Sequence, residues 1–186
     1  MFPIPSPLHP AIVHFPIVLI LIGAALALAA VFLRRWNLPT IAAVCLSLGA
    51  FGSLAATLTG EQEEEMVGEL VPAAERMLDE HEEWAELTRN LAIVAAVISI
   101  AAALMGRFPF VARMSGAVAA LVALAAAFAV AQTGHHGGQL VYRFGVGVHS
   151  MTGNTVPREA GEVQTTPNNV GMVEKKKEAE HEHDHD

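Results

Sequence analysis

Residues 11–33 read AIVHFPIVLILIGAALALAAVFL and contain no Asp, Glu, Lys or Arg. A helix needs roughly 20 apolar residues to cross the ~30 Å hydrocarbon core of a membrane. Residues 38–59, LPTIAAVCLSLGAFGSLAATLT, also lack these four residue types and reach the same length. Because two such uninterrupted runs are too long for the core of a soluble domain, the sequence predicts an integral membrane protein.

Two further apolar stretches complete a predicted bundle of four transmembrane helices, and the fold class is all-α. The third helix should begin at Pro72 with a charged extension, since its fully apolar part is confined to Leu91–Met105. In the fourth, Gly134 is typical of a helix stop, and the glycines and alternating valines that follow favour a turn and a short extended segment. The predicted helices cover residues 10–33, 39–59, 72–106 and 113–133.

Prolines shape the first of these helices. Pro10 suits the first helical position. Pro16 lacks the N–H that would bond to the carbonyl of Ile12, so we expect a kink near His14. A cleaved signal peptide is disfavoured, because no basic segment precedes the run and Arg34-Arg35 follow it as a stop-transfer signal.

The rest of the composition separates a membrane domain from a tail. Residues 1–150 hold the four helices, and residues 151–186 are polar, rich in His and acids at the end, and expected to be mostly disordered. The formal net charge of −8 arises from two acidic segments, and the only basic run is Lys175–Lys177, so nucleic acid is not an expected partner. The single cysteine, Cys45, excludes a disulfide framework and covalently attached haem.

Charge in the short loops predicts the orientation. Arg34 and Arg35 follow the first helix, and Arg107 and Arg113 lie between the third and fourth. Basic residues in short loops favour the cytoplasmic side. The chain should therefore lie in a bacterial inner membrane with both termini on the periplasmic side.

All nine histidines fall on that periplasmic side. Membrane-embedded ionisable residues are costly and often functional, and imidazole is a good ligand for iron, copper and zinc. The histidines of the expected bundle mouth are His9, His14, His81, His135 and His136, and those of the tail are His149, His181, His183 and His185.

Two kinds of cofactor site are open at this stage. A haem b would take two axial imidazoles from His9, His14, His81 and His135, with Arg89 able to pair with a haem propionate. A non-haem Cu, Zn or Fe ion would instead use His14, His81, His135 and His136, with glutamates near His81 as further ligands. The simpler alternatives are a His bonded to a carbonyl and an Arg89 paired with Glu82 or Glu86.

Two further patterns bear on this choice. Small side chains recur every four residues on the second helix, at Cys45, Gly49, Ser53 and Thr57. Such a stripe allows a flat cofactor to approach, although helix packing is the simpler interpretation. In the tail, His181, His183 and His185 alternate with carboxylates and predict a weak metal site, or only a solvated end.

The motifs LHPAIVHFPI at residues 8–17 and TGHHGGQLVYRFGVGV at 133–148 resemble a family of bacterial membrane proteins catalogued as domain of unknown function 2231. The resemblance covers about residues 6–150 and implies a four-helix fold. It places the motif histidine on His135, with His136 at a variable position, so His135 is the one expected to point inward. Similar domains occur beside cytochrome c or Rieske modules, which implies redox work with a separate partner protein.

The first hypothesis is therefore a haem b electron carrier between a membrane donor such as quinol and a periplasmic cytochrome c or Rieske protein. The second is a non-haem metal-binding or metal-handling membrane protein, and the third is a cofactor-free structural or assembly subunit. No nucleophile–base pair or phosphate loop favours a stand-alone enzyme. The oligomeric state is left open.

Overall fold

The computed structural model describes residues 8–33, 37–65 and 67–148. These ranges contain α-helices and no strand: α1 (His9–Ile12), α2 (His14–Phe32), α3 (Leu38–Glu64), α4 (Pro72–Leu104) and α5 (Pro109–Phe144). α1 continues into α2, and the four resulting segments are long and apolar enough to cross a membrane. The predicted all-α membrane fold is confirmed.

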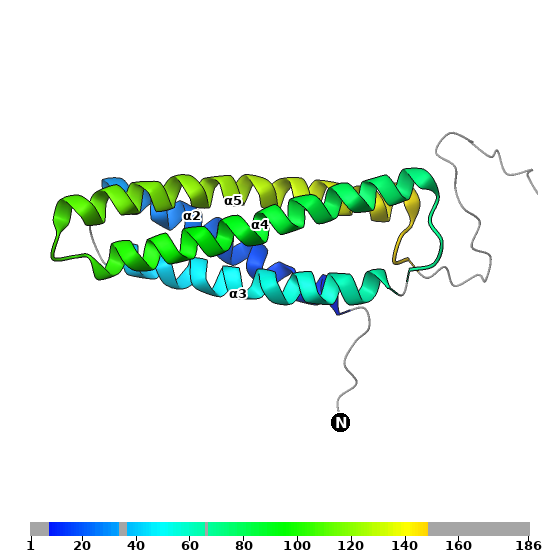
Figure 1. Ribbon diagram of the computed structural model, residues 1–186, viewed down its shortest axis with the longest axis horizontal. Coiled ribbons are helices and arrows are strands. Elements are labelled where there is room, and N and C mark those ends of the chain that lie inside the picture. Colours follow the sequence, from blue (N-terminus) through cyan, green and yellow to red (C-terminus); the bar gives the residue numbers. More distant parts are fainter. Residues whose placement is uncertain (1–7, 34–36, 66, 149–186) are drawn as a thin grey trace, which may run out of the picture.

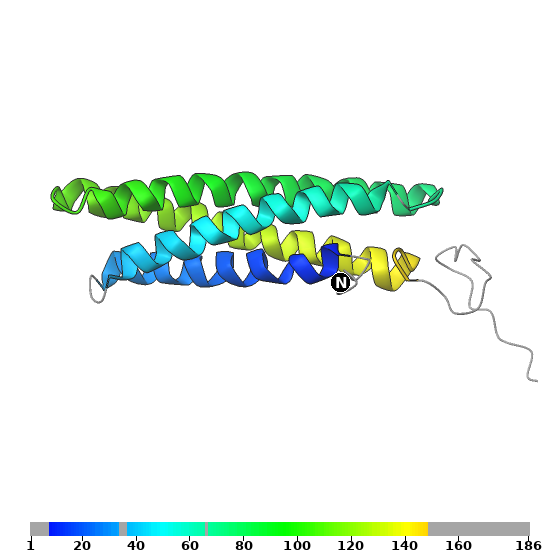
Figure 2. The ribbon, with the colours of Figure 1, turned by 90° about the horizontal axis from the view of Figure 1, so that it is seen from below.

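The four long helices run alternately in opposite directions along one axis (Figure 1). α2 packs against α3, α3 against α4 and α4 against α5, and α5 closes the ring on α2. After a quarter turn, α2 and α4 lie on opposite sides, and α3 and α5 run obliquely between them (Figure 2). We call the end where α1 begins and α5 ends the polar end, and the end that carries Arg107 and Arg113 the arginine end.

The core of the bundle consists mainly of alanine, which lets the helices approach closely. Ile20 and Leu46 are its largest fully buried side chains. Each faces a glycine of the neighbouring helix, because a Cβ at Gly23 would lie 2.8 Å from Leu46 and a Cβ at Gly49 would lie 2.9 Å from Ile20. Large apolar side chains such as Phe15, Phe51 and Phe128 point outward, as expected for a lipid-facing surface.

The helix boundaries agree with the sequence at the first and third predicted helices and differ at the second and fourth. α1 ends at Ile12, whose carbonyl Pro16 cannot reach, so helical hydrogen bonding is interrupted where the kink was predicted. α3 continues past Gly60 to Glu64. α5 continues past Gly134 to Phe144 and ends at Gly145, whose φ of 67° is left-handed, so the predicted end at residue 133 and the extended segment are wrong.

α4 and α5 are longer than a membrane is thick. With 33 and 36 residues, they span roughly 50 Å at about 1.5 Å per residue, against ~30 Å of hydrocarbon. Charged and polar residues occupy the excess at the polar end. We call residues 72–86 of α4 and 134–144 of α5 the polar projection. The expected disordered tail, 151–186, and its histidines lie outside the described residues.

The charged start of α4 also has an inward face. Met77, His81 and Trp84 are half-buried, and Thr88 is buried. On the opposite face Glu75, Asp79, Glu83 and Glu86 are exposed. The inward face of α4 therefore directs His81 toward α5 and the interior of the polar end.

Candidate functional site

Three histidines from three helices gather at the polar end. His9 begins α1, His81 lies one-third of the way along α4, and His136 lies in the last part of α5. All three are partly buried. His9 and His136 both lie near enough to His81 to oppose its protonation, so the three residues occupy the same end of the bundle.

His9 is fixed to the end of α3 by both its main chain and its ring. Its backbone N–H donates to Oε1 of Glu63 at 2.7 Å. Its Nδ1 lies 2.8 Å from the carbonyl oxygen of Ala56 and 3.3 Å from the hydroxyl of Thr59. Gly60 makes room for the ring, since a Cβ there would lie 3.1 Å from Cε1 of His9.

His81 is fixed to α5 in a parallel way. Its Nδ1 lies 3.0 Å from the carbonyl oxygen of Thr133, and a Cβ at Gly137 would lie 3.0 Å from Cε1 of its ring. His81 belongs to the polar projection, outside the apolar part of α4. Burial lowers its pKa, and repulsion from His9 and His136 lowers it further against the opposing hydrogen bond to Thr133.

His136 has both ring nitrogens engaged. Its Nδ1 lies 2.7 Å from the carbonyl oxygen of Gln132, one turn back. Its Nε2 lies 3.3 Å from Oε2 of Glu80. The ring stacks on Trp84 with centroids 6.5 Å apart and an interplanar angle of 18°, and Trp84 meets the ring of Phe128 edge-on. This histidine therefore joins α5 to α4.

These contacts decide the protonation of the rings. A carbonyl oxygen only accepts hydrogen bonds, so Nδ1 of each histidine carries the hydrogen. In the neutral ring, Nε2 then carries the lone pair. Among the described residues, Nε2 of His9 and of His81 has no hydrogen-bond partner, whereas Nε2 of His136 faces Glu80.

The structure does not bring the other predicted ligands to this cluster. The side chain of His14 is exposed on α2. His135 is exposed too, and its Nε2 accepts from the amide of Gln139 at 2.6 Å. The inward position predicted for His135 belongs to His136, whose ring stacks on Trp84 of α4. Within the described ranges, no group of three or more His, Cys, Asp or Glu is placed to hold a metal ion.

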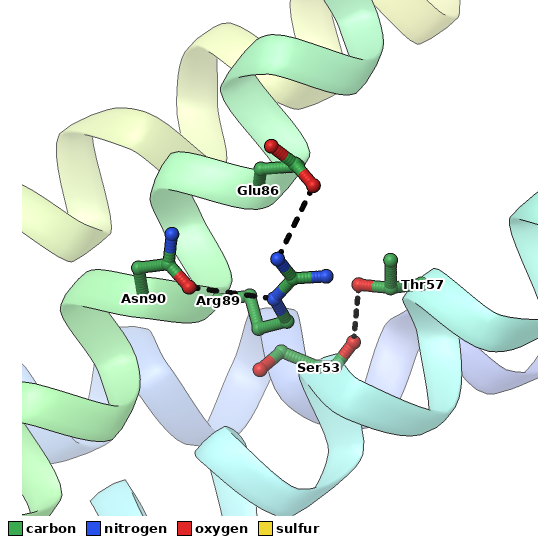
Figure 3. A network of polar contacts seen from close by, with 5 residues as sticks. All are labelled: Ser53, Thr57, Glu86, Arg89 and Asn90. Carbon is green, nitrogen blue, oxygen red and sulfur yellow. Dashed lines mark hydrogen bonds and ion pairs between the residues drawn. The ribbon is translucent and has the colours of Figure 1, made fainter.

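Arg89 adopts the simpler of its two predicted interactions. Its guanidinium lies 3.3 Å from Oε1 of Glu86, and its Nε donates to Asn90. Figure 3 shows the side chain extending from α4 toward Ser53 and Thr57 of α3. On the predicted stripe, Ser53 and Thr57 bond to carbonyls of their own helix and Gly49 packs against Ile20, so these positions serve helix packing.

A pair of carboxyl groups at the polar end was not predicted. Glu82 of α4 shares a hydrogen bond with Glu64 of α3, and this bond, with burial and the nearby charges of Glu64, Asp79 and Glu61, raises the pKa of Glu82 to about 7. Glu82 lies in the polar projection. Its position on the charged face suggested a solvated residue, and only the extension of α3 to Glu64 brings the two groups together.

The fold and its polar end define a small membrane protein with four spans and a histidine cluster. The chain belongs to the family described as predicted membrane proteins of domain of unknown function 2231, whose family model matches residues 5–150. The resemblance seen in the sequence is thereby confirmed. No curated protein and no solved structure matches the chain.

Proposed function

We propose that this protein binds a haem b at its polar end, with His9 and His81 as axial ligands, and transfers electrons through it. One observation carries the proposal. Two imidazoles from separate helices both donate Nδ1–H to a main-chain carbonyl and both leave Nε2 without a partner among the described residues. Metal-ligating histidines almost always have such a hydrogen bond, which fixes the tautomer and orients the ring.

The number of available ligands favours haem over a non-haem ion. Non-haem metal sites normally use three or more protein ligands. Within the described ranges, no group of three or more His, Cys, Asp or Glu side chains is placed to hold a metal ion. Haem iron takes four nitrogens from its porphyrin and needs only two axial groups from the protein. His9 and His81 match that requirement, because Nε2 of His136 is already directed at Glu80.

The packing of the bundle supports a site at the polar end. In the middle of the bundle, close-packed alanines such as Ala92, Ala95 and Ala123 are fully buried. At the polar end, the ring of His9 packs directly against Gly60, and the ring of His81 packs directly against Gly137. Haem iron would supply one-electron chemistry there. The protein's contribution is to hold both rings, and the bonds to Ala56 and Thr133 raise the basicity of Nε2.

The charge distribution suggests the partners. Arg107 and Arg113 mark the arginine end as cytoplasmic by the positive-inside rule, so the polar end would face the periplasm of a bacterial inner membrane. Exposed carboxylates of the polar projection, including Glu75, Asp79 and Glu83, would attract a basic soluble carrier such as a cytochrome c or Rieske protein. A quinol is the natural membrane donor for such a protein.

The visible spectrum of the full chain, purified in detergent, tests the proposal. We expect a Soret band that shifts on reduction with dithionite. His9→Ala and His81→Ala should each remove the low-spin spectrum of bis-imidazole haem, since either change leaves one axial position empty. His14→Ala, on the span that begins with His9, and His135→Ala, on α5, are the control variants and should leave the spectrum intact, because both side chains are exposed.

Three results would contradict the proposal in different ways. A colourless protein with stoichiometric copper, zinc or iron would favour the non-haem metal site. A colourless, metal-free and stably folded protein would favour a structural or assembly subunit. A haem spectrum that survives both His9→Ala and His81→Ala would show that other residues ligate the iron.

A further inference from the structure

Arg89 lies at the level where α4 leaves the membrane toward the polar end. Its neighbour Thr88 contacts Thr133 of α5, with the two hydroxyl oxygens 3.2 Å apart. The part of α5 from Arg113 to Thr133 is roughly 30 Å long at about 1.5 Å per residue, which matches the ~30 Å of hydrocarbon. Because Arg113 marks the membrane surface at the arginine end, Arg89 lies at the opposite surface, among the lipid headgroups.

The guanidinium of Arg89 is held only loosely by the protein. Its Nη2 lies 3.3 Å from Oε1 of Glu86, and its Nε lies 3.4 Å from Oδ1 of Asn90. Hydrogen bonds of this charged type are usually about 2.7–2.9 Å long. Its Nη1 has no acceptor among the described residues, and Figure 3 shows this nitrogen turned toward Thr57 of α3. The guanidinium can therefore accommodate a further acceptor.

Exposed apolar side chains line the seam between α3 and α4 beside Arg89. The charge of Glu61 acts on Glu82 of α4, so this face of α3 is turned toward α4. Leu58 and Leu54 precede Glu61 at successive turns of α3, on the same face, and both are exposed. On α4, Val97 follows Arg89 by two turns and is also exposed. The seam thus has a polar end at the membrane surface and an apolar length within the bilayer, as a phospholipid has.

The charges near Arg89 select the kind of headgroup. Glu86 lies one turn farther from the membrane centre, and its side chain is 61% exposed. Glu82, Glu64 and Glu61 lie beyond it at the same seam. A headgroup with only negative charge would be attracted by Arg89 but repelled by these four carboxyl residues. A zwitterionic headgroup that ends in an ammonium matches both signs.

We infer that the seam between α3 and α4 binds one phosphatidylethanolamine molecule, with its phosphate on Arg89 and its ammonium on Glu86. Guanidinium binds phosphate through two parallel hydrogen bonds. The Arg89–Glu86 pair opens when the lipid binds, which costs little because exposed ion pairs are weak. Each charge then gains an opposite partner, and an acyl chain lies along Leu54 and Val97. The site uses neither of the proposed haem ligands, so this inference is independent of the haem proposal.

Native mass spectrometry of the full chain tests the site. The delipidated protein in detergent is mixed with equal amounts of phosphatidylethanolamine, phosphatidylcholine and phosphatidylglycerol with identical acyl chains. We expect one phosphatidylethanolamine to bind in preference to the other two lipids. The quaternary ammonium of phosphatidylcholine donates no N–H bond to Glu86, and phosphatidylglycerol carries no cation.

Two substitutions separate the two halves of the headgroup. Arg89→Gln should weaken phosphatidylethanolamine binding at least about tenfold, because it removes hydrogen bonds to a charged phosphate. Glu86→Gln should bring the affinities for phosphatidylethanolamine and phosphatidylcholine together. Arg76→Gln and Glu75→Gln are the matched controls, because both residues are exposed on α4 in the polar projection. They should leave the lipid preference unchanged.

Thermal unfolding in lipid-free detergent checks that each variant is folded, and none of the four substituted side chains is buried. Equal binding of phosphatidylethanolamine and phosphatidylcholine by the unmodified protein would overturn the proposal and leave only ordinary boundary lipid at the seam. A preference for phosphatidylglycerol would also overturn it, in favour of an anionic lipid. A loss of binding in Arg89→Gln no larger than in Arg76→Gln would show that the phosphate does not contact Arg89.

Discussion

At the scale of single residues, main-chain carbonyls fix the tautomer and the orientation of two imidazoles at the polar end. The carbonyl of Ala56 holds Nδ1 of His9, and the carbonyl of Thr133 holds Nδ1 of His81. The Nε2 lone pairs of His9 and His81 therefore stay available. For His81, burial and the neighbouring imidazoles lower the pKa and so keep the ring neutral. A neutral imidazole is the form that binds metals.

The carboxyl pair at the same end predicts a pH dependence of stability. The pKa of Glu82 is raised from 4.5 to about 7, first by its hydrogen bond with Glu64. A raised acid pKa means that folding favours the protonated form. The stabilisation is therefore complete below about pH 4.5 and is lost as the pH rises through about 7. We expect the thermal midpoint of the protein to fall between pH 5 and pH 8.

Glu82→Gln isolates this effect. The amide keeps a hydrogen-bond donor toward Glu64 at every pH, so the difference in midpoint between the variant and the unmodified protein should grow from pH 5 to pH 8. Taking this difference cancels the opposite pH dependence from the lowered pKa of His81. Glu83→Gln, at an exposed neighbouring position, is the control. Parallel curves for Glu82→Gln and the unmodified protein would show that the pair is not protonated as described.

Only part of the site could be predicted at this scale. The placement of His9, His81 and His136 at one end of the bundle follows from their positions in the sequence. The choice of His136 over His135 depends on the rotation of α5 about its axis near Gly134, which no local pattern determines. The exposed position of His14 depends in the same way on how the kink at Pro16 rotates the helix.

At the scale of elements, glycines determine how closely α2 and α3 approach. A Cβ at Gly49 would lie 2.9 Å from Cγ1 of Ile20 and 3.2 Å from its backbone nitrogen. Since backbone cannot move aside easily, Gly49→Ala should destabilise the protein by roughly 1–3 kcal/mol through overpacking. Gly116→Ala meets nothing within 4 Å and should be stabilising by about 1 kcal/mol through helix propensity.

Chemical unfolding of both variants in the same detergent measures this difference. The expectation for Gly49 fails if Gly49→Ala proves as stable as Gly116→Ala. In that case α2 and α3 would be able to separate without loss of packing energy, and the fully buried position of Ile20 would contribute little to the assembly of the bundle.

The sequence predicts the existence of these elements better than their ends. Apolar stretches identified four spans, although the fully apolar part of the third, Leu91–Met105, is shorter than the roughly 20 residues that a membrane crossing needs. The end of α5 was misplaced because Gly134 and the following glycines are typical of a helix stop. Here Gly137 serves instead as the contact surface for His81 of α4, so tertiary packing maintains a helix that local propensity would end.

At the scale of the whole molecule, the arrangement predicts how the protein sits in its membrane. Charged residues and histidines occupy the polar end, and Arg107 and Arg113 occupy the other. We expect the polar end on the periplasmic side. In a Cys45→Ala background, Ala73→Cys should react with a membrane-impermeant maleimide in intact spheroplasts. Gly106→Cys should react only in inverted vesicles. Both positions are exposed, and the reverse pattern of labelling would place the histidines in the cytoplasm.

The break that Pro16 imposes has a consequence for the order of assembly. α1 is a single turn, and its first residue is attached to α3 through Glu63, Ala56 and Thr59. The hydrogen bond that would couple this turn rigidly to α2 is missing at Ile12. We therefore expect this turn to open more readily than the spanning helices. The proposed haem would thus be able to enter a bundle that has already folded, and His9 would bind it last.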